Sequence, residues 1–137
     1  MIHTTNYTDT FIEVAEDCKA EKGMEPPLKE VQKSIARMQY ELLRNHPYTL
    51  TSDELIFEIH VMRKQIPDQL KAMERESFFS KGQACMRASD LPKKYGWGIH
   101  FDKNSRMAIY AVDSKEYSNL KNDPDILHKK AMRSSRK

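Results

Sequence analysis

The sequence predicts an α+β fold, with a mixed and largely antiparallel sheet of about five strands covered on one face by helices. Apolar side chains recur every three or four residues over 28–45, which is typical of a helix that buries one face. Apolar side chains alternate over 97–101 and 107–112, with the turn-forming residues 102–105 between them, which predicts a β-hairpin. Strand-like and helical segments follow one another along the chain, so the predicted order is β-α-β-α-β-β-β-α.

The chain has the length of one domain. Its 137 residues, of which 31% are charged, are typical of a globular protein with a single core. We place this domain at residues 1–127 and a basic tail at 128–137, where five Lys and Arg residues stand without an acidic one. Residues 1–80 carry ten Lys and Arg against fourteen Asp and Glu, whereas 81–137 carry thirteen against six. The basic C-terminal half favours an anionic partner, although a solvated end that aids solubility explains the same charges.

Three elements are predicted in the first half of the chain. Residues 10–15 are rich in β-forming side chains and predict a strand. The helix predicted over 28–45 ends at His46-Pro47, since the residue before a proline avoids helical backbone angles. Residues 55–62 carry apolar side chains on both faces of a strand, which predicts a central strand of the sheet.

A helix over 67–80 is predicted next, because proline fits the first turn of a helix. Leu70, Met73 and Ser77 are expected to face inward. Gly82 is expected to follow the end of this helix, where glycine is common.

The second half is predicted to consist mainly of strands. Residues 83–88 predict a third strand and 90–95 a short helical turn, followed by the hairpin. Asp113 and Glu116 have the spacing of a capping box, which predicts a helix through Leu120. A short helical piece is expected before the tail.

The segment 81–102 concentrates rare residues. It holds three of the four glycines, the only tryptophan and one of the two cysteines. Clustered glycines beside reactive and cationic side chains suggest a shaped site. Side chains alternate between the two faces of a strand, so the predicted strands place four polar residues on one surface of the sheet. These residues are Cys85, Arg87, Ser89 and His100.

Two kinds of chemistry are candidates for this surface. Cys85 and His100 would form a thiolate–imidazole pair, the nucleophile of a Cys-dependent enzyme, but a cysteine in a strand is also a common small core residue. Arg87 would bind a carboxylate or a phosphate through its planar guanidinium. The alternative for Arg87 is a structural ion pair with Glu58 or another acid.

Cationic and aromatic side chains lie together just before the hairpin. Such sets bind nucleic-acid backbones and stack bases. Trp97 also stands where a core residue is expected, together with Ile99 and Phe101. The residues predicted to bind a ligand are Arg87, Ser89, Lys93, Lys94, Tyr95, Trp97 and His100.

Several classes of function find no support. The five histidines and two cysteines show no metal-ligand spacing, so no metal is predicted, and no cofactor motif is present. No apolar run approaches the roughly 20 residues that span a bilayer, so no membrane partner is expected. The N-terminus lacks a secretion signal, which with only two cysteines predicts a cytoplasmic protein with reduced thiols.

Several motifs taken together resemble a known family. They are His3-Thr4-Thr5-Asn6-Tyr7, Thr10-Phe11-Ile12, Gln39-Tyr40-Glu41, His46-Pro47-Tyr48, Thr51-Ser52-Asp53, Phe79 to Ser89, Tyr95 to His100 and the closing Lys130 to Arg136. The chain resembles a family of small uncharacterised microbial proteins classed only as a domain of unknown function. The resemblance spans nearly the whole chain and implies a single domain that includes the C-terminal Met-Arg-Ser segment.

The favoured hypothesis is therefore a small cytosolic binding domain that recognises an anionic small molecule or protein group through Arg87 and its neighbours. One alternative is a nucleic-acid-binding accessory protein that uses the basic tail and the loop before the hairpin. The other is a Cys-dependent enzyme that uses Cys85. The oligomeric state stays open.

Overall fold

A four-stranded sheet organises the computed structural model, which describes residues 3–29 and 31–135. The strands are β1 (Thr10–Glu13), β2 (Trp97–Phe101), β3 (Met107–Ala111) and β4 (Leu127–Lys130), in the spatial order β3-β2-β1-β4. β1 pairs antiparallel with β2 and β2 antiparallel with β3, whereas β4 runs parallel to β1. The sheet is therefore mixed, and the described residues form four strands rather than about five.

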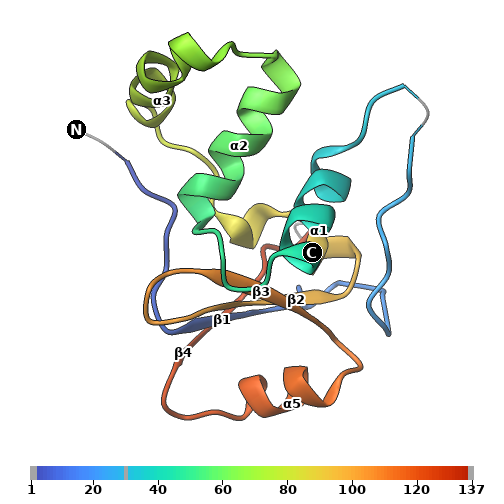
Figure 1. The fold of residues 1–137 in the computed structure, drawn as a ribbon. Coiled ribbons are helices and arrows are strands. Elements are labelled where there is room, and N and C mark those ends of the chain that lie inside the picture. Colours follow the sequence, from blue (N-terminus) through green and yellow to red (C-terminus); the bar gives the residue numbers. More distant parts are fainter. Residues whose placement is uncertain (1–2, 30, 136–137) are drawn as a thin grey trace.

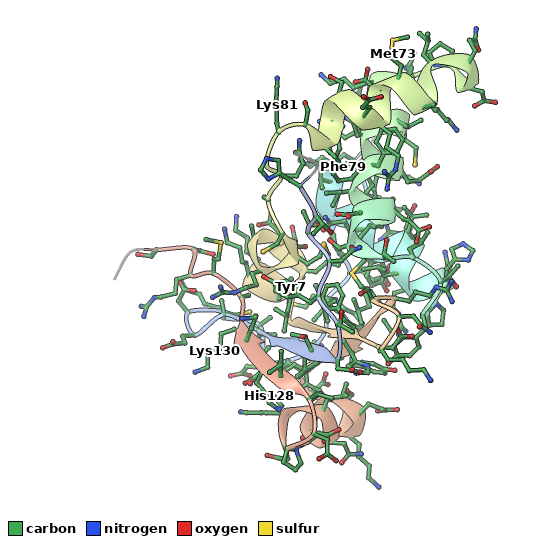
Figure 2. The ribbon with its side chains drawn as sticks, turned by 90° about the vertical axis from the view of Figure 1, so that its left-hand side faces the viewer. Tyr7, Met73, Phe79, Lys81, His128 and Lys130 are labelled. Carbon is green, nitrogen blue, oxygen red and sulfur yellow. The ribbon has the colours of Figure 1, made fainter. Side chains whose placement is uncertain are left out.

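Helical segments connect the strands. In chain order they are α1 (Ile35–Asn45), α2 (Ser52–Lys64), η1 (Asp68–Leu70), α3 (Lys71–Phe79), η2 (Met86–Ala88), α4 (Asp90–Lys94) and α5 (Lys115–Lys121), the η elements being single 3₁₀ turns. α1, α2 and α4 lie over one face of the sheet and α5 lies on the other (Figure 1). Figure 2 shows Met73 at the outer end of α3 and Phe79 where α3 returns towards the body of the protein.

Both faces of the sheet carry buried side chains. Ile12 and Ile99, which pair across β1 and β2, belong to the core that α1, α2 and α4 cover. Phe11 points to the opposite face, where its ring meets that of Tyr117 in α5 edge to face, with 5.0 Å between the ring centres. The expectation that helices cover only one face is therefore wrong, because the fully buried Phe11 requires a cover of its own.

The segment 55–62 is the largest departure from the sequence prediction, because it lies inside α2 and not in a strand. The Thr51 hydroxyl accepts the Glu54 N–H at 3.1 Å, and the Glu54 carboxylate accepts the Thr51 N–H at 2.9 Å. Leu55 and Ile59, one helical turn apart, are both buried in the core. This capping box and the four-residue spacing outweigh the β-propensity of the segment.

The predicted third strand, residues 83–88, is also wrong. The segment ends in η2 and lies beside the chain that follows β4, where the Met132 N–H donates to the Arg87 carbonyl at 2.8 Å. The sequence of β4 shows no alternation of apolar side chains, so it does not predict a strand. In the structure, Leu127 and His128 are exposed. Parallel pairing with β1 creates this strand.

The predicted basic tail begins inside the sheet. Residues 128–130 complete β4. Farther on, the N–H groups of Ser134 and Ser135 donate to the Asp17 carboxylate, each at 2.9 Å from Oδ2. The final residues of the tail, 136 and 137, lie outside the described part of the chain.

The predicted first helix is shorter than expected. α1 begins at Ile35, where the Ser34 hydroxyl accepts a backbone N–H of the first turn. Leu28 and Val31 therefore stay outside the helix, and both are exposed, while residue 30 lies outside the described residues. The helix ends at Asn45, as the following His46-Pro47 predicts.

α3 turns a different face inward than the one expected. Leu70, Met73 and Ser77 are exposed, whereas Phe79 is buried among the aromatic side chains of the α2–α3 hairpin. Aromatic rings bury more apolar surface than these three side chains, so they decide the orientation. α3 ends at Phe79, so the predicted Gly82 does not directly follow it. The N-cap residue of α5 is Ser114, one residue after the predicted Asp113.

Candidate functional site

A cavity of about 430 Å³ lies between α1, α2 and the segment 83–90, and we call it the α1–α2 cavity. Its wall is mainly apolar and includes Ile35, Ala36, Ile56, Ile59 and Met86. The polar side chains in the wall are Gln39, His60, Arg63, Lys64, Gln83, Cys85, Ser89 and Asp90. A largely apolar cavity of this size with a few polar groups is the usual form of a small-molecule site.

Gln39 forms the polar part of the α1 wall. The Ser89 hydroxyl donates to Gln39 Oε1 at 2.6 Å and accepts the Leu91 N–H at 3.1 Å, so Ser89 both caps α4 and fixes Gln39. Gln39 and Ser89 expose only 6% and 9% of their surface. Gln39 follows Ile35 by one turn, which is the spacing of the apolar stripe of α1.

His60 and Arg63 lie on the α2 wall. His60 Nε2 pairs with Glu74 Oε1 of α3 at 2.9 Å, and the His60 ring centre lies 4.5 Å from that of Phe78. The Arg63 guanidinium reaches the start of α1, where its Nη1 makes a long contact of 3.5 Å with the Lys33 carbonyl. Arg63 forms no ion pair within residues 3–29 and 31–135.

Cys85 forms part of the cavity wall and is partly buried. The Tyr7 hydroxyl donates to Cys85 Sγ at 3.3 Å. Burial, together with this bond to Cys85, raises the pKa of Tyr7 to about 12, so the phenol remains a donor at neutral pH. Lys129 Nζ lies 5.7 Å from the centre of the Tyr7 ring. The neighbour of the thiol is therefore a tyrosine and not a histidine.

Arg87 contacts the C-terminal part of the chain. Its Nε donates to the Lys130 carbonyl at 2.7 Å, and its own carbonyl accepts the Met132 N–H. Arg87 therefore binds the last residue of β4, on the edge of the strand that does not pair with β1. The alternative of an ion pair with Glu58 does not occur, since Arg87 has no ion pair among the residues that the structure describes.

His100 lies on the other face of the sheet. It pairs with Phe11 in the β1–β2 ladder, so both side chains point towards α5 and away from the α1–α2 cavity. The prediction that His100 shares a face with Cys85, Arg87 and Ser89 is therefore wrong, and no thiol–imidazole pair forms. The alternation rule fails here because residues 83–88 are not a strand.

His100 belongs to a polar cluster of its own. Its Nδ1 lies 2.7 Å from the Tyr48 hydroxyl, which in turn lies 2.9 Å from the Tyr110 hydroxyl. Burial lowers the pKa of His100, while the carboxylates of Asp102 and Asp9 act in the opposite direction without reversing the shift. The neutral imidazole is therefore the form that the fold favours.

We expect this shift to make the protein less stable in mild acid. Below the pKa of about 6.5 of an unfolded histidine, the unfolded chain binds a proton that the folded chain resists. His100 therefore lowers the free energy of unfolding by up to about 1.4 kcal/mol per pH unit as the pH falls from 6.5 towards its folded pKa. Urea unfolding of wild type and His100→Gln between about pH 7.5 and 5 measures the difference. If the free energy of unfolding changed equally with pH in the two proteins, the lowered pKa of His100 would be refuted.

The cationic and aromatic side chains before β2 have different surroundings. Trp97 exposes 6% of its surface, and its Nε1 donates to the Met24 carbonyl at 2.8 Å, so its ring is part of the core and cannot stack on a base. Lys93 and Lys94 lie on α4, where Lys94 forms a long ion pair with the first residue of the helix. Tyr95 ends α4 and packs against the core.

Metal ligands do not gather in the described part of the chain: no group of three or more His, Cys, Asp or Glu side chains there could hold a metal ion. The helices in the same residues are all too short or too polar to cross a membrane. Cys18 and Cys85 are free thiols.

A protein-family model matches residues 2–137, almost the whole chain, and describes a family of unknown function, DUF6157. The chain belongs to the DUF6157 family. The resemblance drawn from its motifs is thereby confirmed. Searches of curated proteins and of solved structures gave no match.

Two of the motifs that resemble the DUF6157 family meet in the structure and form what we call the N-terminal clasp. The Asp53 carboxylate accepts hydrogen bonds from the Thr4 hydroxyl at 2.7 Å and from both the N–H and the hydroxyl of Thr5 at 2.8 Å. Asn6 Oδ1 accepts the Asp53 N–H at 2.9 Å. The clasp holds the N-terminal segment against the start of α2. The same segment contains Tyr7, whose hydroxyl donates to Cys85 Sγ.

Of the residues predicted for the site of this DUF6157 chain, Cys85 and Ser89 lie in the cavity wall. Gln39, Arg63 and Tyr7 are not among the predicted site residues. Gln39 carried a signal, since it is a polar residue at the spacing of an apolar stripe. Arg63 carried none, because an exposed cation near the end of a helix is common. Tyr7 is distant in sequence from Cys85, and only the fold brings the two together.

Proposed function

We propose that this chain is a binding domain for a small molecule, and that its ligand occupies the α1–α2 cavity. The observation that carries the proposal is the cavity of about 430 Å³, with a mainly apolar wall surface and eight polar side chains in the wall. Apolar ligand surface buried there contributes about 25 cal/mol for each Å² removed from water. The polar groups would fix the orientation of the ligand.

The proposal moves the binding site of the favoured hypothesis away from Arg87. Arg87 is engaged by the Lys130 carbonyl and is not part of the cavity wall, whereas Cys85 and Ser89 are. The buried ring of Trp97 weakens the case for a nucleic-acid site at the loop before β2, because stacking needs an open aromatic face. Both the volume of the α1–α2 cavity and the mixture of apolar and polar side chains in its wall support it as the binding site.

A thermal-shift screen of metabolites, nucleotides and short oligonucleotides tests the proposal. We expect small molecules to raise the melting temperature of the wild type, since a ligand stabilises the folded state by mass action. Ala88→Phe places a ring in the cavity wall and should abolish the rise. Ala72→Phe makes the same change at an exposed position of α3 and should leave the rise unchanged.

Two results would count against the proposal. Ligands that stabilise Ala88→Phe as much as the wild type would show that they bind elsewhere. A screen in which only oligonucleotides raise the melting temperature, with a steep dependence on salt, would favour the nucleic-acid hypothesis.

A further inference from the structure

We infer that the ligand of the α1–α2 cavity carries a carboxylate, which the Gln39 amide and the Arg63 guanidinium recognise. The inference rests on the proposed function, because it assigns the chemical class of the same ligand. It starts from a hydrogen-bond donor in the cavity wall that has no protein partner.

The orientation of the Gln39 amide follows from its neighbour. The Ser89 hydroxyl donates its single hydrogen to Gln39 Oε1 at 2.6 Å, and Ser89 Oγ accepts the Leu91 N–H at 3.1 Å. In this arrangement the Gln39 oxygen faces Ser89, and its NH₂ group is left for other contacts. None of the described residues accepts a hydrogen bond from this NH₂ group, although Gln39 is only 6% exposed.

The open space beside the Gln39 amide nitrogen is the α1–α2 cavity. In the described part of the chain, no fully buried side-chain nitrogen or oxygen lacks a partner. Because the Gln39 nitrogen has none, it must reach open space, and Gln39 lines the cavity. A ligand that displaces water from this point must offer a hydrogen-bond acceptor, since an unmet donor costs free energy.

Positive charge also lies in the cavity wall. The Arg63 contact with the Lys33 carbonyl places the guanidinium just before the start of α1, six residues before Gln39 in the chain. The first turn of this helix, with Ile35 and Ala36 in the cavity wall, contains no acidic residue. The N-terminal end of a helix carries a partial positive charge, which adds to that of Arg63.

The acidic side chains nearest the cavity are already paired. Asp90, which lines the cavity, lies 4.0 Å from Lys94, and Glu74 pairs with His60 at 2.9 Å. Within residues 3–29 and 31–135, no acidic side chain forms an ion pair with Arg63. A carboxylate, a planar acceptor with two oxygens, suits one amide donor and one guanidinium, while its apolar body fits the isoleucine side chains of the wall.

Three compounds with one carbon skeleton test the inference: 3-phenylpropanoate, 3-phenylpropanamide and 3-phenylpropylamine. Isothermal titration calorimetry measures their dissociation constants for the wild type. We expect the acid to bind about tenfold more tightly than the amide, because the amide lacks the charge that strengthens both hydrogen bonds, and the amine to bind weakest.

Two variants locate the recognition. Gln39→Glu keeps an oxygen for Ser89 and replaces the NH₂ group by a second oxygen, so at mildly alkaline pH it should remove the preference for the acid. A buried glutamate can impair folding, so the exposed Arg63→Met is the second variant, and it should weaken acid binding about tenfold with amide binding unchanged. Arg75→Met replaces an exposed arginine on α3 that lies outside the cavity wall, and it should leave the dissociation constants of the three compounds unchanged.

Equal affinities for the acid and the amide, or an Arg63→Met protein that still prefers the acid, would overturn the carboxylate assignment and leave the proposed function intact. So would a thermal-shift screen whose cavity ligands lack an acidic group, with no binding of the three compounds at millimolar concentration. A screen without any cavity ligand would overturn the proposed function itself.

Discussion

Asp53→Ala is expected to lower the free energy of unfolding by about 3 kcal/mol or more. The Asp53 carboxylate accepts three hydrogen bonds from Thr4 and Thr5 in the N-terminal clasp, and Asp53 is only 9% exposed. A hydrogen bond to a charged group contributes about 1.5–3 kcal/mol, and a buried donor left without its partner adds a desolvation cost. Urea denaturation followed by circular dichroism measures the loss.

Two further variants separate the clasp from a general effect of removing an acid. Asp53→Asn keeps one acceptor oxygen and should fall between the wild type and Asp53→Ala. Asp68→Ala removes a carboxylate whose side chain is 93% exposed and whose ion pair with Lys71 lies at the surface, so its effect should stay within about 0.5 kcal/mol. Equal stabilities of Asp53→Ala and Asp68→Ala would contradict the role of the clasp.

Gly98→Ala is expected to lower the free energy of unfolding by about 3 kcal/mol, at the upper end of what overpacking a core costs. A Cβ at this position would lie 2.6 Å from Phe11 Cζ and 2.6 Å from Tyr117 Cε2. Both rings are buried between the sheet and α5, so neither can move aside without opening this contact. Thermal unfolding in the same buffer compares the variant with the wild type.

Gly82→Ala is the matched control for Gly98→Ala. Nothing lies within 4 Å of a Cβ at Gly82, so its stability should stay within about 0.5 kcal/mol of the wild type. A Gly98→Ala protein as stable as Gly82→Ala would show that α5 does not pack on the sheet as described. Part of the glycine cluster in 81–102 is thus explained by close packing.

The sequence predicted those elements whose signals are local. β1, β2 and β3 form where β-rich segments and a turn predict them, and Trp97, Ile99 and Phe101 are core residues as expected. Apolar side chains on both faces of 55–62 predict a strand, but the capping box at Thr51 starts a helix there. β4 depends on pairing with β1, more than a hundred residues away, and such pairing leaves no local pattern.

The candidate site was predictable only in part for the same reason. The sequence predicts Cys85 and Ser89 as polar residues on one surface, in a segment that holds three of the four glycines. Their partners Tyr7 and Gln39 lie on other elements and reach them only after folding. A strand over 83–88 would place His100 on the same face as Cys85. This strand does not form, and His100 lies on the other face of the sheet.

The most direct test of the α1–α2 cavity as a ligand site is a titration of ¹⁵N-labelled protein, followed by backbone amide NMR, with the tightest ligand from the screen. We expect the largest shifts at Gln39, His60 and 84–90, with α5 and β4 unchanged, and we expect Ala88→Phe to remove them. Shifts centred on β4 and Arg87, retained in Ala88→Phe, would contradict the account.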